Sequence, residues 1–87
     1  MPKGVITGIV RLYTTWQLLY EIDGEQLGIV EFDQRPLARF YERATGRDLN
    51  HDYAGGQGLR DVSMHLTGLR ISVTGERPTQ YVRLERD

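Results

Sequence analysis

Cysteine is absent from the sequence, and this excludes a disulfide framework, a thiolate metal site and a thiol nucleophile. No run of apolar residues approaches the roughly 18 to 20 that a membrane span requires. The first residues lead directly into an alternating pattern, where a secretory signal would have a continuous apolar stretch. From these absences we expect no membrane association and a cytoplasmic location.

An excess of charge of one sign is also lacking. The 87 residues include 11 basic and 12 acidic side chains, so the formal charge of −1 gives no global attraction to nucleic acid or to anionic lipid. A composition of 39% hydrophobic and 26% charged residues is that of an ordinary globular protein. Because the chain is shorter than most domains, we expect one domain over residues 1–87.

The first third of the chain has the period-two pattern of β-strands. Apolar and β-branched residues alternate with polar ones over 5–13, 16–22 and 27–32, and in the first run Ile6, Val10 and Leu12 share one parity. Asp23-Gly24 lies between the second and third runs and is typical of a hairpin turn. The pattern predicts a three-stranded meander. Three aromatic residues on predicted strands are expected in the core or on a sheet surface that contacts a partner: Trp16, Tyr20 and Tyr81.

The period changes to that of a helix between residues 33 and 46. Apolar residues recur at i, i+3, i+4 and i+7, which places them on one helix face: Leu37, Phe40, Tyr41 and Ala44. Asp33 can cap the start, Pro36 suits a first-turn position, and Gly46 suits the left-handed residue beyond the end. One amphipathic helix is therefore predicted here.

No period is evident over 48–61, which we expect to be a glycine-rich loop. After it, inward apolar residues occupy even positions up to Leu66 and odd positions from Leu69, so the parity changes at Gly68. A Thr67-Gly68 hairpin or a bulge at Gly68 would explain the change, and the turn preferences favour one long bulged strand. A turn at 75–78 and a last strand over 80–85, with Val82 and Leu84 inward, complete the chain.

The predicted fold is α+β: a single antiparallel sheet of about five strands, in the order β-β-β-α-β-β, with one amphipathic helix packed on one face. The other face has no second layer within the chain. That open face, or an edge strand, is suited to dimerisation or to strand addition from a partner.

Four arginines form the most suggestive functional pattern. Arg35, Arg39 and Arg43 are spaced i, i+4 and i+8 along one helix face, and Arg47 follows the predicted helix end. Guanidinium groups in such a row can bind phosphates, an acidic protein surface or a nucleic-acid backbone. The alternative is a solvated helix face, because ten of the 11 basic residues are arginine throughout this chain.

Other motifs are incomplete. Asp48, Asn50 and Asp52 have the spacing that opens a calcium loop, but Tyr53 stands where glycine is needed and Leu59 where the bidentate glutamate is needed. The glycines at 55–58 lack the Gly-Lys-Ser/Thr ending of a phosphate-binding loop. Neither motif predicts a ligand.

The usual catalytic residues do not form a recognisable set either. Ser63 and Ser72 lie in predicted strands and not on a nucleophile elbow. His65 has the opposite parity from Met64, which places it at the solvent side or the rim of the sheet, with only His51 as a second histidine. We expect no catalytic site, no metal and no cofactor.

The sequence thus favours a small non-enzymatic binding or regulatory module that acts through protein–protein contacts. The open sheet face or an edge strand would provide the contact, and the arginine-bearing helix would provide charge complementarity. The expected partner is another protein or a second copy of the chain. The alternative function is binding of nucleic acid or a phosphate ligand through four residues: Arg35, Arg39, Arg43 and Arg47.

Overall fold

The computed structural model describes residues 3–55, 57–75 and 80–85. The described chain contains, in order, β1 (Lys3–Leu12), β2 (Thr15–Ile22), β3 (Gln26–Asp33), α1 (Gln34–Thr45), α2 (Leu49–Gly55), α3 (Leu59–Leu66), β4 (Arg70–Thr74) and β5 (Tyr81–Leu84). The strands form one antiparallel sheet in the order β3-β2-β1-β4-β5. The predicted α+β class and antiparallel sheet are confirmed, but the prediction of a single helix is wrong. No helix of the described chain is long and apolar enough to cross a membrane.

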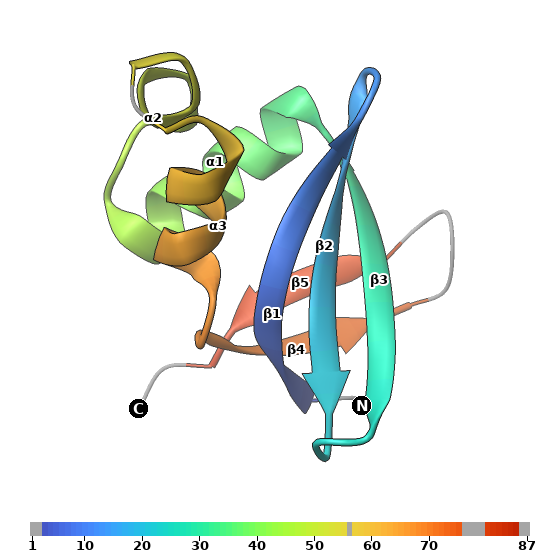
Figure 1. Ribbon diagram of the computed structural model, residues 1–87. Helices are drawn as coiled ribbons and strands as arrows, with labels where there is room; N and C mark the ends of the chain where they lie inside the picture. The colour runs from blue at the N-terminus through green and yellow to red at the C-terminus, as the bar shows by residue number, and fades with distance from the viewer. Residues whose placement is uncertain (1–2, 56, 76–79, 86–87) are drawn as a thin grey trace.

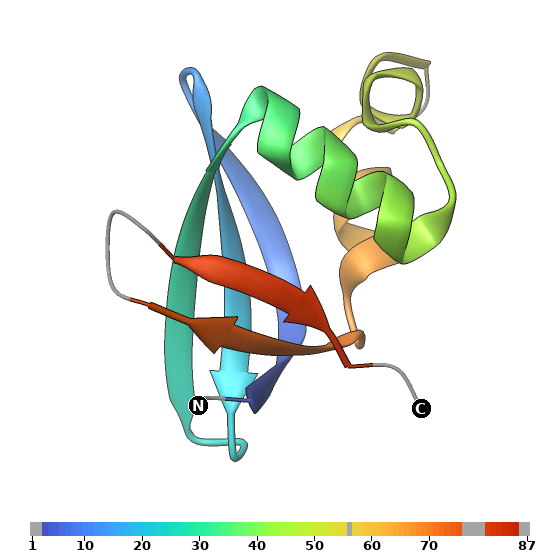
Figure 2. The same cartoon turned by 180° about the vertical axis from the view of Figure 1, so that it is seen from behind.

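The sheet is strongly curled. The meander of β1, β2 and β3 forms one arm, and the β4–β5 hairpin crosses behind it as the second arm (Figure 1). Strand pairing joins the two arms at the start of β1, where Lys3, Gly4 and Val5 pair with residues 70–72. The helices gather beside the curled sheet, with α1 next to β5 when the molecule is seen from behind (Figure 2). The radius of gyration of 12.1 Å is that of a compact chain of this length.

The core lies between the two arms of the sheet and the helices. The sheet contributes Ile6, Ile9, Trp16, Leu18, Tyr20, Val30, Ile71 and Val73, and the helices contribute Leu37, Phe40, Tyr41, Leu49, Val62 and Leu66. Burial of each large aliphatic side chain stabilises the fold by about 1.5–3 kcal/mol. The predicted core positions of Trp16 and Tyr20 are confirmed. Tyr81 is 68% exposed and is not a core residue.

The structure places a β-bulge in β1. Its pairing with β2 shifts register between Ile6 and Gly8, so Ile6 and Ile9 are both buried although their positions differ in parity. Leu12, which was expected to share the face of Ile6, is 45% exposed as a result. The predicted bulge at Gly68 is wrong, because Gly68 lies in the turn after α3 with φ at +94°.

The segment before β4 is helical, which corrects two predictions at once. Residues 49–55 form α2 where a loop was expected, and 59–66 form α3 where the end of that loop and the first half of a long strand were expected. Leu59, Val62 and Leu66 have i, i+3, i+7 spacing and pack on the core from one helix face. Met64 is 63% exposed because a helix turns it away from Val62 and Leu66.

The predicted helix over 33–46 is confirmed as α1. Asp33 occupies the N-cap position without a side-chain capping hydrogen bond. Gly46 has φ at 74°, and its N–H donates to the Glu42 carbonyl at 2.7 Å, which ends the helix in the left-handed conformation that glycine favours. The buried residues of α1 are those of the predicted stripe, with Ala44 partly buried beside them: Leu37, Phe40 and Tyr41.

Candidate functional site

The four arginines singled out in the sequence have three different surroundings. Arg35 is exposed on α1, whereas Arg39 and Arg43 line a groove between α1 and β5. Arg47 lies beyond α1 and forms a bidentate ion pair with Asp52. The structure therefore brings Arg39 and Arg43 together and directs Arg47 elsewhere.

Asp52 is the buried acceptor of the Arg47 fork. The two N–H···O distances are 2.7 Å from Nε to Oδ2 and 3.1 Å from Nη2 to Oδ1, and the Asp52 side chain is only 4% exposed. Hydrogen bonds from Arg47 and from Tyr41 favour the charged carboxylate and lower the pKa of Asp52 to about 2. An anion from outside would have to displace this carboxylate to reach the inner face of the Arg47 guanidinium.

Tyr41 and His65 complete the polar cluster. The Tyr41 hydroxyl donates to Asp52 Oδ2 at 2.6 Å and lies 2.8 Å from His65 Nδ1. The hydroxyl has a single proton, which it donates to Asp52. We therefore assign the proton of the Tyr41–His65 hydrogen bond to His65 Nδ1, which donates to the Tyr41 oxygen. His65 thus points from α3 into the helical layer, and its predicted place at the sheet rim is wrong because its segment is a helix.

The electrostatics of the cluster favour a structural role. Burial and the neighbouring Asp52 carboxylate raise the pKa of Tyr41 far above its ordinary value, while the pKa of Asp52 is lowered. The phenol therefore stays neutral and the carboxylate stays charged at every ordinary pH, so neither group is suited to proton transfer. The cluster joins α1, α2 and α3 to one another.

The residues of the incomplete calcium motif have separate partners at the start of α2. Asp48 Oδ1 accepts hydrogen bonds from the backbone N–H groups of Asn50 at 2.9 Å and His51 at 3.3 Å. Asn50 Oδ1 accepts from Gln34 Nε2 at 2.7 Å, and Asp52 is bound to Arg47. Within residues 3–55, 57–75 and 80–85, no group of three or more His, Asp or Glu side chains is placed to hold a metal ion.

A second candidate site is the groove between α1 and β5, which has both polar and apolar lining residues and which we call the α1–β5 groove. It consists of two adjoining hollows of about 560 and 390 Å³ that share Phe40, Arg43 and Val82. The larger hollow opens towards β3 and the smaller towards the end of β5. The remaining lining residues are Glu31, Phe32, Asp33, Pro36, Arg39, Gln80, Tyr81, Arg83 and Leu84.

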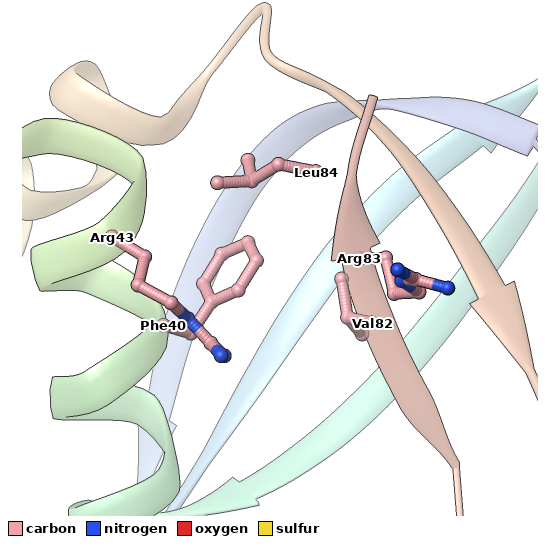
Figure 3. Close-up of a pocket in the computed structure, with 5 residues that line it drawn as sticks. All are labelled: Phe40, Arg43, Val82, Arg83 and Leu84. Atoms are coloured by element: carbon pink, nitrogen blue, oxygen red, sulfur yellow. The ribbon is translucent and has the colours of Figure 1, made fainter. Parts of the chain in front are cut away.

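The inner wall of the groove is apolar. Phe40 reaches from α1 towards β5, where Val82 and Leu84 are half-buried against the core (Figure 3). The Phe40 ring stacks on Phe32 with 5.8 Å between ring centroids, and this contact joins α1 to the end of β3. Arg83 points to the side of β5 away from the helix in the same view.

Among the residues that the structure describes, no strand pairs with the edge of β5 that faces this groove. β5 is the last strand of the sheet and pairs with β4 on one side, while α1 lies beyond its other side (Figure 2). The Glu85 N–H donates to the Arg70 carbonyl at 2.9 Å, so these two residues are a hydrogen-bonded pair. In an antiparallel ladder such pairs alternate with non-hydrogen-bonded pairs. By this alternation, the backbone N–H and carbonyl groups of Arg83 and Tyr81 face β4, and those of Val82 and Leu84 face away from β4.

Comparisons with known proteins identify no relative. No protein-family model, no curated protein and no solved structure matches the chain. The candidate function therefore rests on the geometry of the site alone.

Proposed function

We propose that this protein is a non-enzymatic binding module that holds an extended segment of a partner protein against β5, inside the α1–β5 groove. The observation that carries the proposal is the free edge of β5 beside an apolar wall. Strand addition at a sheet edge uses main-chain hydrogen bonds for affinity and alternate side chains for specificity.

The backbone of β5 offers a short but complete set of hydrogen-bonding groups. Val82 and Leu84 each have an N–H and a carbonyl directed away from β4, which together suit about four residues of an added strand. Natural proteins usually cover, charge or shorten such an edge, because it pairs readily with other chains. β5 is short, with four residues, but its outward side opens on the groove.

The side chains around the groove match an extended segment with alternating character. Phe40, Val82 and Leu84 form the apolar wall for residues that point inwards, and charged residues surround the opening. The arginines of α1 that line the groove, Arg39 and Arg43, support recognition of an acidic residue in the partner. The arginine-bearing helix and the edge strand thus belong to one surface.

The pKa shifts of Tyr41 and Asp52 in the polar cluster favour a binding role. Burial raises the pKa of Tyr41 and hydrogen bonds lower the pKa of Asp52, so the pKa values of both groups lie further from neutrality than their ordinary values.

The alternative, binding of nucleic acid or a phosphate ligand through the helix arginines, has less support. Glu31 and Asp33 line the same hollow as Arg39, and Arg47 is paired with Asp52 inside the chain. Phosphate binding would be expected to weaken steeply as salt rises, since bound counterions are released from the nucleic acid. Salt dependence therefore separates the two functions.

The proposal is tested by selecting binders from a displayed library of random twelve-residue peptides. Wild-type protein and two variants, Val82→Pro and Val82→Ala, are used in parallel. Both variants remove the isopropyl group, but only proline removes the outward N–H, and proline is tolerated at an edge position whose N–H faces away from the ladder. Thermal melting of each variant checks that it is folded.

We expect peptides that bind wild type and Val82→Ala and that lose at least tenfold in affinity for folded Val82→Pro. In a second pair, Arg39→Glu weakens binding whereas Arg35→Glu, the same charge change one helical turn outside the groove, leaves it unchanged. Failure to enrich any peptide, or equal binding to Val82→Pro, would contradict the proposal. Binding of a single-stranded oligonucleotide that falls steeply with salt and with Arg39→Glu would favour the alternative instead.

A further inference from the structure

The geometry points to a spontaneous modification site in the turn between β2 and β3: we propose that Asp23 isomerises to isoaspartate through a cyclic succinimide formed with Gly24. The turn lies at the other end of β3 from the residues that line the α1–β5 groove, so this inference is independent of the proposed function. Its evidence is the residue that follows Asp23, the exposure of the turn and the hydrogen bonding of its backbone.

The reaction needs only the chain itself and water. The backbone nitrogen of Gly24 attacks the side-chain carboxyl carbon of Asp23, and a C–N bond forms. The hydroxyl of the protonated carboxyl group leaves with the amide proton as water, which closes the succinimide ring. Water then opens the ring at one of its two carbonyl carbons. Opening at the side-chain carbonyl restores aspartate, whereas opening at the main-chain carbonyl leaves the chain connected through the side chain, which is isoaspartate.

Gly24 is the residue that makes this position reactive. Because glycine has no Cβ, its backbone nitrogen approaches the preceding carboxyl carbon with less hindrance than that of any other residue. A Cβ built at Gly24 would have no neighbour within 4 Å, so the space around the ring is open as well. Asp23 is the only aspartate or asparagine in the sequence that precedes a glycine.

The turn leaves the attacking nitrogen accessible. Asp23, Gly24 and Glu25 are exposed, and within the described residues the Gly24 N–H donates no hydrogen bond. The hydrogen bond that closes the turn runs from the Glu25 N–H to the Ile22 carbonyl at 3.1 Å. Asp23 has φ at +51°, a left-handed conformation that is less favourable for aspartate than for glycine. An exposed turn of this kind opens at low cost, and the opened chain reaches the conformation that ring closure requires.

The other described aspartates are less suited to this reaction. The carboxylates of Asp48 and Asp61 accept hydrogen bonds from backbone N–H groups, and Asp52 is buried in an ion pair. Each of these residues, like Asp33, precedes a residue that has a Cβ. The chain thus contains its own reference sites for the rate at Asp23.

Isoaspartate would change the hairpin at its turn. It adds one carbon to the main chain between Ile22 and Gln26, which are the last pair of the β2–β3 ladder. The geometry of the turn sets the register of a hairpin, so this end of the ladder should fray in the modified chain. The buried pair of Leu18 and Val30 lies further along the ladder, and we therefore expect the modified chain to stay folded.

The test is incubation of the full chain at neutral pH and physiological temperature in water enriched in the heavy isotope of oxygen. Each ring opening adds one solvent oxygen, so mass spectrometry of the digested chain detects the reaction even where aspartate is restored. Electron-transfer fragmentation of the same peptide distinguishes isoaspartate from aspartate. We expect label and isoaspartate to accumulate at Asp23 about tenfold faster than at any other described aspartate, because this site combines a following glycine with an unbonded amide.

Two matched variants compare the turn with a reference site. Asp23→Asn tolerates the left-handed conformation and forms the same ring with loss of ammonia in place of water. It should react faster than wild type, because the amide is uncharged, whereas the carboxylate must first be protonated. Asp48→Asn places the same amide before a leucine and should stay unmodified over the same period.

Three outcomes overturn the inference. In the first, Asp23 stays unlabelled in the folded chain while a urea-unfolded sample becomes labelled, which shows that the turn protects the site. In the second, Asp23 and the other described aspartates are labelled at equal rates. In the third, Asp23→Asn and Asp48→Asn lose ammonia at equal rates. None of these results bears on peptide binding in the α1–β5 groove, so the proposed function is tested separately.

Discussion

Asp52 is the residue at which the helices of this protein meet. Its carboxylate accepts hydrogen bonds from Arg47, beyond the end of α1, and from Tyr41, within α1, while His65 of α3 lies 3.5 Å away. This placement also explains why one of the four arginines found in the sequence is not part of the α1–β5 groove. A buried charge in such a position is costly to leave without its partners.

Replacing the Asp52 carboxylate should therefore lower stability in a pH-dependent way. Arg47 and Tyr41 lower the pKa of Asp52 in the folded protein to about 2, against an ordinary value of 3.8, so the unfolded chain binds the proton more readily. The stabilisation is then fully present above about pH 4 and is lost as the pH falls from about 4 to 2. Asp52→Asn should lower the free energy of unfolding at pH 7 and flatten its decrease between pH 4 and pH 2.

Urea denaturation at several pH values measures both effects. Asp48→Asn is the control, because asparagine keeps the side-chain oxygen that accepts the backbone N–H groups at the start of α2. Stability curves for Asp52→Asn that run parallel to those of wild type through the acid range would show that the Asp52 pKa is not lowered by folding.

Single residues were predicted best where the local pattern alone decides their surroundings. Trp16 and Tyr20 are buried as expected from strand alternation, and Gly46 takes the left-handed conformation at the end of α1. His65 was placed on the wrong side, because its surroundings depend on how distant segments pack. For Tyr81, the core position was expected first, but the side chain is exposed. The pairing of Arg47 with Asp52 has no local signature, since their i, i+5 spacing suits neither a helix nor a strand.

At the scale of elements, α3 shows how a short apolar run can satisfy two periods. Val62, Met64 and Leu66 alternate as in a strand, while Leu59, Val62 and Leu66 have helical spacing. The periodicity of an eight-residue run cannot distinguish a helix from a strand. The glycines before this run led to the wrong prediction of a loop. Helix α1 was identified correctly because its stripe, first-turn proline and terminal glycine all agree.

Truncation of two neighbouring residues distinguishes a helix from a strand over 59–66. Leu66→Ala should cost about 2–5 kcal/mol in the free energy of unfolding, because Leu66 is fully buried. Met64→Ala should change it by no more than about 0.5 kcal/mol, because Met64 is 63% exposed. In a strand the two residues would share one face and lose similar amounts. Comparable losses, measured by urea denaturation, would contradict the helix.

The bulge in β1 is a local feature that affects the shape of the whole sheet. β1 pairs with β4 through Lys3, Gly4 and Val5, and it pairs with β2 on both sides of the register shift between Ile6 and Gly8. Twist and bending increase at a bulge. The parity change at Gly68 predicted a bulge there, but Gly68 lies in the turn after α3.

For the whole molecule, the sequence predicts the class of fold and leaves the functional surface open. The α1–β5 groove is assembled from β3, α1 and β5, segments separated by up to 50 residues, and it exists because the sheet curls (Figures 1 and 2). No periodicity within a single segment of the sequence shows that β3, α1 and β5 lie side by side. The position of β5 beside Arg39 and Arg43 is therefore evident only in the structure.

The most direct test of strand addition at β5 is amide hydrogen exchange, residue by residue, on the protein alone and saturated with a selected peptide. In the free protein the amides of Val82 and Leu84 should exchange rapidly, because they face the groove, while that of Arg83 is protected by its hydrogen bond to β4. Peptide binding should protect Val82 and Leu84 and leave Arg83 unchanged. Protection that appears elsewhere, with Val82 and Leu84 still exchanging rapidly in the complex, would contradict strand addition in the α1–β5 groove.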